Sequence, residues 1–286
     1  MKVRIKGMVK SMFQLIKRLM ISREGTIGLA IMVFYIILAV FAPYISPFNP
    51  YAQDFESLQP PSVSHLLGTD PLGRDVFSRI VYGARIALLF AFGVAGISMI
   101  VGILLGAFAG YFGGLLDDVL SRAFEVVFML PSFFLIILAV AIYGASIINA
   151  LLIVAFTMWP SNARITRAQV LTLKKRLYVD AATVTGAGTL RKIFCHILPN
   201  GILPVIVNST FQMSAAVLME SALSFLGLGD PNAVSWGRIL WDAQRNLTAW
   251  WLMAPGVTIA TLCLGFALLA DGISIAFSPR LQGEKA

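Results

Sequence analysis

The chain has 286 residues, of which 58% are hydrophobic and only 13% are charged, and its mean hydropathy is +0.83. A soluble domain carries about a quarter charged residues, so this composition excludes an ordinary soluble protein. The apolar residues form long runs, as in proteins that span a membrane. The net charge of +8 does not indicate nucleic-acid binding, because the basic residues flank apolar runs and accompany no nucleic-acid recognition motif.

The first apolar run covers residues 26–45 and follows a basic N-terminal segment, 1–25, that holds seven Lys and Arg residues. A run of about 20 residues is long enough to cross a bilayer. No small-residue cleavage site ends it, and the chain continues through Ala42-Pro43-Tyr44. We therefore predict a retained transmembrane helix rather than a removed signal peptide.

Five further apolar runs predict five more transmembrane helices. They cover residues 86–112, 126–143, 146–161, 202–223 and 252–275. The expected fold is all-α: a polytopic membrane protein with six transmembrane helices. The first helix and the segment 46–85 precede a core, 86–276, that contains the other five helices and a polar loop at 162–200, and a tail follows at 277–286.

The distribution of basic residues predicts the orientation of this fold. With the N-terminus in the cytoplasm, 17 of the 22 Lys and Arg residues lie in the N-terminal segment, the loops 113–125 and 162–200 and the tail. The remaining basic residues lie in the extracytoplasmic segments 46–85 and 224–251. Because cytoplasmic segments of membrane proteins are enriched in Lys and Arg, both termini are expected in the cytoplasm.

Two sets of residues inside the apolar runs are candidates for helix packing and for function. Gly102, Gly106 and Gly110 recur every four residues, which on a helix forms a strip where another backbone can pack closely. The alternative is that glycine is simply common in membrane helices. Glu220 and Asp271 lie within or near the ends of the last two helices, where a charge is expensive and often functional. They are candidates for the substrate pathway or for interfacial caps.

The loop 162–200 is long for a passive connection. Asp180 can cap a short helical segment after it, Gly186 and Gly188 are natural breakers, and Pro199 suits the entry to the next helix. We expect a short helix across the cytoplasmic face that exposes small residues for docking into another protein. The residues alone leave open a solvated basic loop that merely enforces topology.

Within this loop, Asp180-Ala181-Ala182, Gly186 and Leu198-Pro199 resemble the EAA loop of ABC-importer permeases, with the family's spacing from the acidic residue to the proline. Two positions depart from the family pattern. Asp180 stands in place of the usual Glu, which keeps the charge but shortens the reach, and His196 stands where Ile is common.

Three other blocks resemble the inner-membrane permeases of oligopeptide, dipeptide and nickel ABC importers, specifically the "C" partner of the permease pair. They are Leu67-Gly68-Thr69-Asp70-Pro71-Leu72-Gly73-Arg74-Asp75-Val76, Ser224-Phe225-Leu226-Gly227-Leu228-Gly229 and Ser235-Trp236-Gly237. The resemblance extends from about Arg23 to Arg280. It implies the permease architecture of a type I ABC importer in the cell membrane, the inner or plasma membrane.

The resemblance also implies a mechanism and partners. The loop would be a coupling helix that docks on one of two cytoplasmic ATPase subunits, which bind ATP and Mg. A second permease would complete a heterodimer, and an extracytoplasmic binding protein would deliver di- or oligopeptides. Nickel and oligosaccharides are alternative cargoes. We expect no cofactor, no metal site and no hydrolysis on this chain, since the P-loop pattern is absent from its sequence.

Two functions of other classes are the alternatives. A membrane-embedded enzyme would need His or clustered acids at membrane depth. The two histidines, His65 and His196, are expected on opposite sides of the membrane, so this function is disfavoured. An ATP-independent secondary transporter or channel would be favoured by broken helices and paired midplane charges, neither of which the sequence displays clearly.

Overall fold

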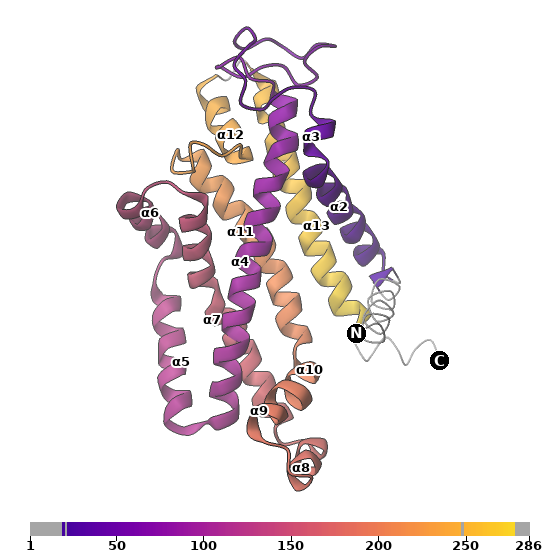
Figure 1. Cartoon of the computed structure of the whole chain (residues 1–286), viewed down its shortest axis with the longest axis vertical. Helices are drawn as coiled ribbons and strands as arrows, with labels where there is room; N and C mark the ends of the chain where they lie inside the picture. Colours follow the sequence, from indigo (N-terminus) through magenta and orange to yellow (C-terminus); the bar gives the residue numbers. More distant parts are fainter. Residues whose placement is uncertain (1–18, 21, 247–248, 278–286) are drawn as a thin grey trace.

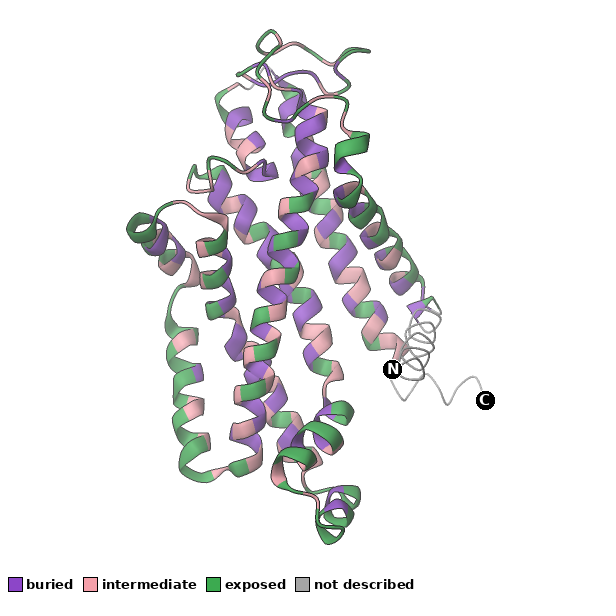
Figure 2. Ribbon diagram, in the orientation of Figure 1, coloured by how far each residue is buried: buried purple, intermediate pink, exposed green. Residues whose placement is uncertain are grey.

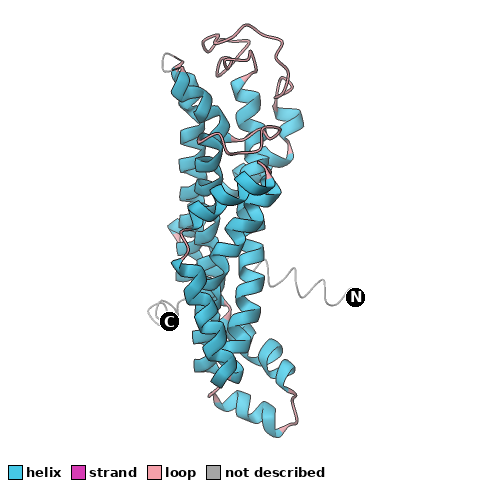
Figure 3. Ribbon diagram, turned by 90° about the vertical axis from the view of Figure 1, so that its left-hand side faces the viewer, coloured by secondary structure: helices cyan, strands magenta, loops and turns pink. Residues whose placement is uncertain are grey.

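The computed structural model describes residues 19–20, 22–246 and 249–277. Within these residues the chain is α-helical, and its β pairing is limited to an isolated bridge between Thr69 and Asp75. Long helices run side by side along the longest axis, with the segment 46–75 and α12 (Trp236–Arg245) at one end and α8 (Leu177–Val184) at the other (Figures 1 and 3). We call these the α12 end and the α8 end.

The termini are only partly described. All Lys and Arg residues of the predicted basic N-terminal segment, except Arg23, lie outside the described residues. The predicted tail lies outside them as well, apart from Phe277. The orientation expected from the basic residues therefore stays a prediction.

Five helices form the bundle, and α4 (Val76–Phe112) is the longest of them. At 1.5 Å per residue its 37 residues extend about 55 Å. It packs along α7 (Ile147–Leu173) and against α11 (Leu203–Phe225). On its other side α2 (Arg23–Val40) packs on α13 (Ala254–Ala276), which also contacts α11. The residues between these helices are buried, whereas many outward positions are exposed and apolar, as a lipid-facing surface requires (Figure 2).

Short elements connect and flank these helices. They are α3 (Ala42–Ile45), α9 (Thr189–Arg191), the π-helix η1 (Lys192–Ile197), α10 (Leu198–Gly201) and the 3-10 helix η2 (Trp250–Met253). All of them lie at the two ends of the bundle, where the chain turns between long helices.

The predicted span 126–143 is not one straight helix. The structure has α5 (Gly114–Met129) and α6 (Ser132–Tyr143), which are bent by 79° relative to each other. Pro131 explains the break, because proline has no N–H to donate and disfavours helical backbone at the preceding residue, here Leu130 with ψ of 123°. In addition, α5 begins inside the segment 113–125, which the sequence analysis treated as a loop.

Two other helices are longer than the apolar runs within them. The predicted span 86–112 is part of α4, which begins ten residues earlier, at Val76, because the Asp75 side chain caps its first turn. The predicted span 146–161 is the first part of α7, which continues to Leu173 through residues assigned to the loop. By contrast, α11 and α13 begin and end within two residues of their predicted spans.

Three helices of the described chain are each long and apolar enough to cross a membrane: α2, α4 and the continuous segment of η2 and α13. The number rises to five if the bent pair of α5 and α6, and that of α9–α10 and α11, each form one span. The helix α7 does not pass this test. The chain is thus a multi-pass, all-helical membrane protein, and the count of six spans stays a prediction.

Candidate functional site

The helix α8 projects beyond the bundle, between the end of α7 and the elements that lead into α11 (Figure 1). One face of it is anchored. Val179 and Ala182 are buried, and Val179 belongs to an apolar cluster with Ile193, Ile197 and Leu198 that packs against α4 and α7. The position of α8 is therefore fixed by hydrophobic contacts with the bundle rather than left to a mobile loop.

The opposite face of α8 is open. Asp180 and Ala181 are exposed, and so are two large apolar side chains, Leu177 at 85% and Val184 at 89%. Asp180 forms no ion pair with any described residue. Its predicted role as a cap is wrong: Arg176 occupies the N-cap position, without a side-chain hydrogen bond, and Asp180 lies within the first turn of the helix.

Gly186 ends α8 in a backbone conformation that favours glycine, with φ of 81°. The N–H of Gly186 donates to the Thr183 carbonyl at 3.0 Å, and the N–H of Ala187 donates to the Ala182 carbonyl at 2.9 Å. This pair of bonds is a Schellman motif, which satisfies carbonyls at the end of the helix. No atom lies within 4 Å of where a Gly186 Cβ would be, so backbone conformation, not crowding, selects glycine here.

The other two residues of the predicted loop motif lie where the chain returns to the bundle. Leu198 is buried at 7% exposure, and Pro199 is exposed at the start of α10. Pro199 cannot donate a backbone hydrogen bond, and the π-helix η1 directly precedes α10. The residues of the motif thus form two groups: Asp180, Ala181, Gly186 and Pro199 are exposed, whereas Ala182 and Leu198 are buried and anchor the loop.

Gly102, Gly106 and Gly110 of α4 all face α7. A Cβ at Gly102 would lie 2.5 Å from the Asn162 Cβ, one at Gly106 would overlap the Ala163 carbonyl oxygen, and one at Gly110 would lie 2.8 Å from the Arg167 carbonyl oxygen. Only glycine lets the two backbones approach this closely along three successive turns.

Two polar contacts hold α7 at the α8 end. The Arg167 guanidinium donates two hydrogen bonds to the Asp117 carboxylate of α5. The Lys174 ammonium donates to the carbonyl oxygens of Gly110, at 2.8 Å, and Tyr111, at 3.3 Å, near the end of α4. A cation at this position satisfies free carbonyls and opposes the negative end of the helix dipole. These contacts hold the end of α7 against α4 and α5, and the segment that leads into α8 starts from this fixed point.

A polar cluster that sequence reasoning missed joins α4, α7 and α11. The Asn162 side-chain amide donates to Ser98 Oγ and to Gln212 Oε1, each at 3.0 Å, and its oxygen accepts from Asn208 at 2.8 Å. Ser98 and Asn162 are fully buried. Because an unpaired amide away from water is costly, such a cluster fixes the relative register of the helices that share it.

The α12 end carries a network of charges that links three segments. Asp70 accepts hydrogen bonds from Arg74 and Arg79, and both guanidiniums also lie within 3.5 Å of the Asp242 carboxylate on α12. Burial raises the pKa of the Asp242 carboxyl above its usual range, and the neighbouring Arg79 opposes this effect. Two of these residues, Asp70 and Arg74, belong to a sequence block that resembles the permease family, and the sequence alone predicted no role for them.

Further contacts fix the segment 46–75 on the bundle. Asp75 accepts from the backbone N–H and the hydroxyl of Ser78, both at 2.7 Å, and lies 3.0 Å from His65 Nδ1. The Trp251 indole donates to the Thr69 carbonyl at 3.0 Å. The segment is therefore an ordered cap on the bundle.

The structure does not bring Glu220 and Asp271 together. Glu220 is buried near the α12 end of α11, where Ser224 donates a hydrogen bond of 2.7 Å to its carboxyl group. Asp271 is exposed near the opposite end of α13, one residue before Gly272, which packs against Gly25 of α2. The two acids therefore do not form one site within this chain.

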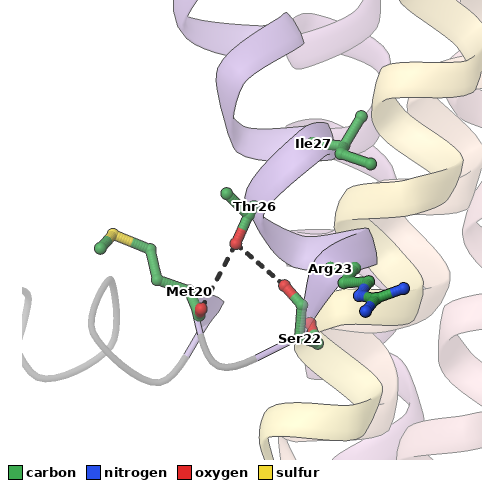
Figure 4. Close-up of a pocket in the computed structure, with 5 residues that line it drawn as sticks. All are labelled: Met20, Ser22, Arg23, Thr26 and Ile27. Carbon is green, nitrogen blue, oxygen red and sulfur yellow. Dashed lines mark hydrogen bonds between the residues drawn. The ribbon is translucent and has the colours of Figure 1, made fainter.

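A small hollow of 270 Å³ lies beside the start of α2, near this end of α13 (Figure 4). It is lined by Met20, Ser22, Arg23, Thr26 and Ile27. The Thr26 hydroxyl donates to the backbone carbonyl of Ser22 at 2.9 Å, so the polar groups there serve the first turn of the helix. Among the described residues that line the hollow, no His, Lys, Asp or Glu accompanies the two hydroxyls as a general base, so the hollow does not have the composition of a catalytic site.

Comparison with known proteins identifies the family to which the chain belongs. Residues 102–283 match the family model described as "Binding-protein-dependent transport system inner membrane component". The chain belongs to this family of permeases. Residues 11–61 also match the model described as "N-terminal TM domain of oligopeptide transport permease C". The matched segments include part of the ordered cap, all of α8 and of the glycine strip, and the polar cluster except Ser98.

Curated relatives of this permease cover most of its length. The chain is 41% identical to a di/tripeptide transport system permease protein of Pseudomonas aeruginosa, over 89% of this chain and 88% of the relative. It is 42% identical to a dipeptide transport system permease protein of Escherichia coli, over 91% of this chain and 90% of the relative. A dipeptide permease of Haemophilus influenzae is 38% identical, over 91% and 92% respectively.

Proposed function

We propose that this chain is one of two permease subunits that form the translocation pathway of an ATP-driven importer of di- and oligopeptides. Its membership in the binding-protein-dependent permease family and its similarity to dipeptide permeases over about nine-tenths of its length support this function. The chain supplies membrane helices and a coupling surface, and it hydrolyses nothing itself.

The observation that carries the proposal is the geometry of α8. It combines an anchored face with an exposed face of Leu177, Asp180 and Val184, and it lies between α7 and α11. Exposed apolar residues on a rigid helix are typical of a surface that docks into a groove of another protein. In this function α8 is the coupling helix, and its partner is a cytoplasmic ATPase subunit that binds ATP and Mg.

Transmission of movement follows from the contacts around α8. Closure of two ATPase subunits displaces α8, and the buried contacts of Val179 and Ala182 pass this displacement to the bundle. The glycine strip joins α4 to α7, and the polar cluster joins both helices to α11, so the three helices respond as a rigid unit. The α8 end is then cytoplasmic, with both termini on the same side, and the protein resides in the cell membrane.

The α12 end then faces outward. Its ordered cap and α12 would receive an extracytoplasmic binding protein loaded with peptide. A second, homologous permease completes the pathway, so that substrate passes between the two subunits. In this arrangement the substrate is selected largely by the binding protein and needs no catalytic group on this chain.

Site-specific cross-linking combined with transport tests this function. In a background where Cys195 and Cys263 are replaced by Ser, a cysteine at Val184 should cross-link to an ATPase subunit. A cysteine at the fully exposed Val63, at the α12 end, is the matched control and should not. Peptide uptake into membrane vesicles should require both ATP and the binding protein. Full uptake without ATPase subunits would refute the proposal and favour a secondary transporter.

A further inference from the structure

An apolar groove of about 690 Å³ runs between α2 and α4 near the α12 end. Its walls consist of Ile36, Ala39, Val40, Leu88, Leu89, Phe92 and Gly93, with Arg85 as its one charged residue. Leu89 and Phe92 are about half exposed inside it. This groove is separate from the coupling surface, the polar cluster and the charge network.

The position of the groove along the bundle indicates the level of a membrane surface. Arg85 lines it together with Val40, the last residue of α2. Immediately beyond this helix, Phe41 is 50% and Tyr44 86% exposed. Aromatic side chains concentrate at the boundary between lipid tails and headgroups, so the mouth of the groove lies at headgroup level and its apolar walls lie beside the acyl chains.

Arg85 differs from the other arginines in this part of the chain. Arg74 and Arg79 lie against the carboxylates of Asp70 and Asp242. Arg85 is exposed, forms no ion pair with a described residue, and lies 5.8 Å from the ring of Tyr82. A guanidinium is always charged at neutral pH and matches phosphate oxygens through paired N–H donors. Arg85 therefore places one positive charge, with no ion-pair partner among the described residues, beside the apolar groove.

We propose that this groove binds one phospholipid of the leaflet at the α12 end, with an acyl chain against Leu89 and Phe92 and the phosphate on Arg85. An anionic headgroup fits best, since it neutralises a cation that has no ion-pair partner among the described residues. A transmembrane helix of a partner subunit is the competing occupant. It would place apolar side chains against the guanidinium unless it supplied its own carboxylate. The inference requires only that the protein is embedded in a membrane, so it stands independently of the importer function.

Native mass spectrometry of the intact membrane complex tests the proposal by counting retained lipids. The complex is first delipidated in mild detergent and then titrated with palmitoyl-oleoyl phosphatidylglycerol. The wild type should retain one such lipid. Arg85→Gln removes the charge and should weaken retention by roughly tenfold, as expected for a lost charge-assisted hydrogen bond. Leu89→Trp fills the groove and should abolish retention.

Two control variants separate the groove from general effects. Arg245→Gln removes another exposed arginine at the α12 end, one that stacks on Trp241, and Ile100→Trp enlarges an exposed residue of α4 outside the groove. Both should retain the lipid as the wild type does. Equal retention in Arg85→Gln and wild type would overturn the headgroup assignment. Equal retention in Leu89→Trp and wild type would overturn the groove itself.

A photo-cross-linking residue at position 89 identifies the occupant directly. A diazirine analogue of leucine there, which keeps the side chain close to its native size, should form a lipid adduct on irradiation of the complex in vesicles that contain phosphatidylglycerol. An adduct to a second permease chain in place of lipid would overturn the proposal, because it would assign the groove to the subunit interface.

Discussion

The guanidinium of Arg167 in α7 binds the carboxylate of Asp117 in α5 through hydrogen bonds of 2.5 Å from Nε and 2.7 Å from Nη2. Two parallel bonds between planar groups fix both distance and orientation. The Arg167 side chain is 35% and that of Asp117 13% exposed, so solvent weakens the pair only in part. The contact fixes α5 against α7, the helix that precedes α8. It matters because α5 ends at Met129 and is not continuous with α6.

This pair should contribute to stability more than an exposed one does. In a double-mutant cycle of Arg167→Met and Asp117→Asn, we expect a coupling free energy of about 1 kcal/mol, the upper part of the range for partly exposed pairs. The exposed pair of Arg122 and Glu125, at 2.7 Å, is the control and should give a few tenths of that value. Thermal unfolding in detergent measures both cycles. Equal coupling free energies in the two cycles would contradict the larger contribution expected of the Arg167–Asp117 pair.

The contact between α4 and α7 should depend on glycine at position 106. Gly106→Ala places a methyl group against the carbonyl of Ala163, so the helices must separate or shift, at a cost of about 1–3 kcal/mol. Gly96 of the same helix has no atom within 4 Å of the added methyl group. Gly96→Ala should therefore be neutral or slightly stabilising. Melting temperatures of the two variants should differ by several degrees, and equal values would argue against close packing here.

The coupling surface should be sensitive to charge and to the backbone at its end. Asp180→Lys reverses a charge that has no described ion-pair partner within the chain, so folding should persist while peptide uptake falls by at least tenfold. Amounts of protein in the membrane and co-purification of the ATPase subunits separate the two effects. Uptake and bound ATPase at wild-type levels in Asp180→Lys would refute the proposed coupling role of α8.

Gly186→Val should also impair uptake, for a different reason. Its φ of 81° costs a β-branched residue about 1–2 kcal/mol, which should distort the end of α8. Gly188 lies two residues further on, has an ordinary φ of −65° and has no atom within 4 Å of a Cβ. Gly188→Ala is thus the matched control and should transport normally. Similar loss in both variants would point to general sensitivity of the loop.

Stability of the cap should depend on pH through Asp242. Because burial raises its pKa in the folded protein, the carboxyl contributes stability below about pH 4, and this contribution is lost as the pH rises through the raised pKa. Asp242→Asn should flatten that part of the profile. Thermal unfolding measured between pH 4 and pH 8 gives the profile. The exposed Asp54→Asn is the control, and an unchanged profile in Asp242→Asn would contradict this prediction.

Local sequence was sufficient for features that depend on runs of neighbouring residues. Apolar runs located α11 and α13 to within two residues, because the thickness of a bilayer sets the length of such runs. The spacing of Asp180, Gly186 and Pro199 led to the permease family, to which the chain belongs. An apolar run does not reveal a bend within it: Pro131 separates α5 from α6 although the run around it is continuous.

Tertiary structure alone decided the contacts between distant segments. Nothing in the local pattern pairs Asn162 with Gln212, or Arg79 with Asp242, since each partner lies on a different helix and the pairing depends on how the helices pack. The sequence by itself determined a helical membrane permease and located the loop for which we propose a docking role, because hydrophobic length and motif spacing are local properties. Only the fold decided which face of α8 is exposed, what the glycine strip contacts and that Arg85 lines an apolar groove, because packing assigns the partners of every buried group.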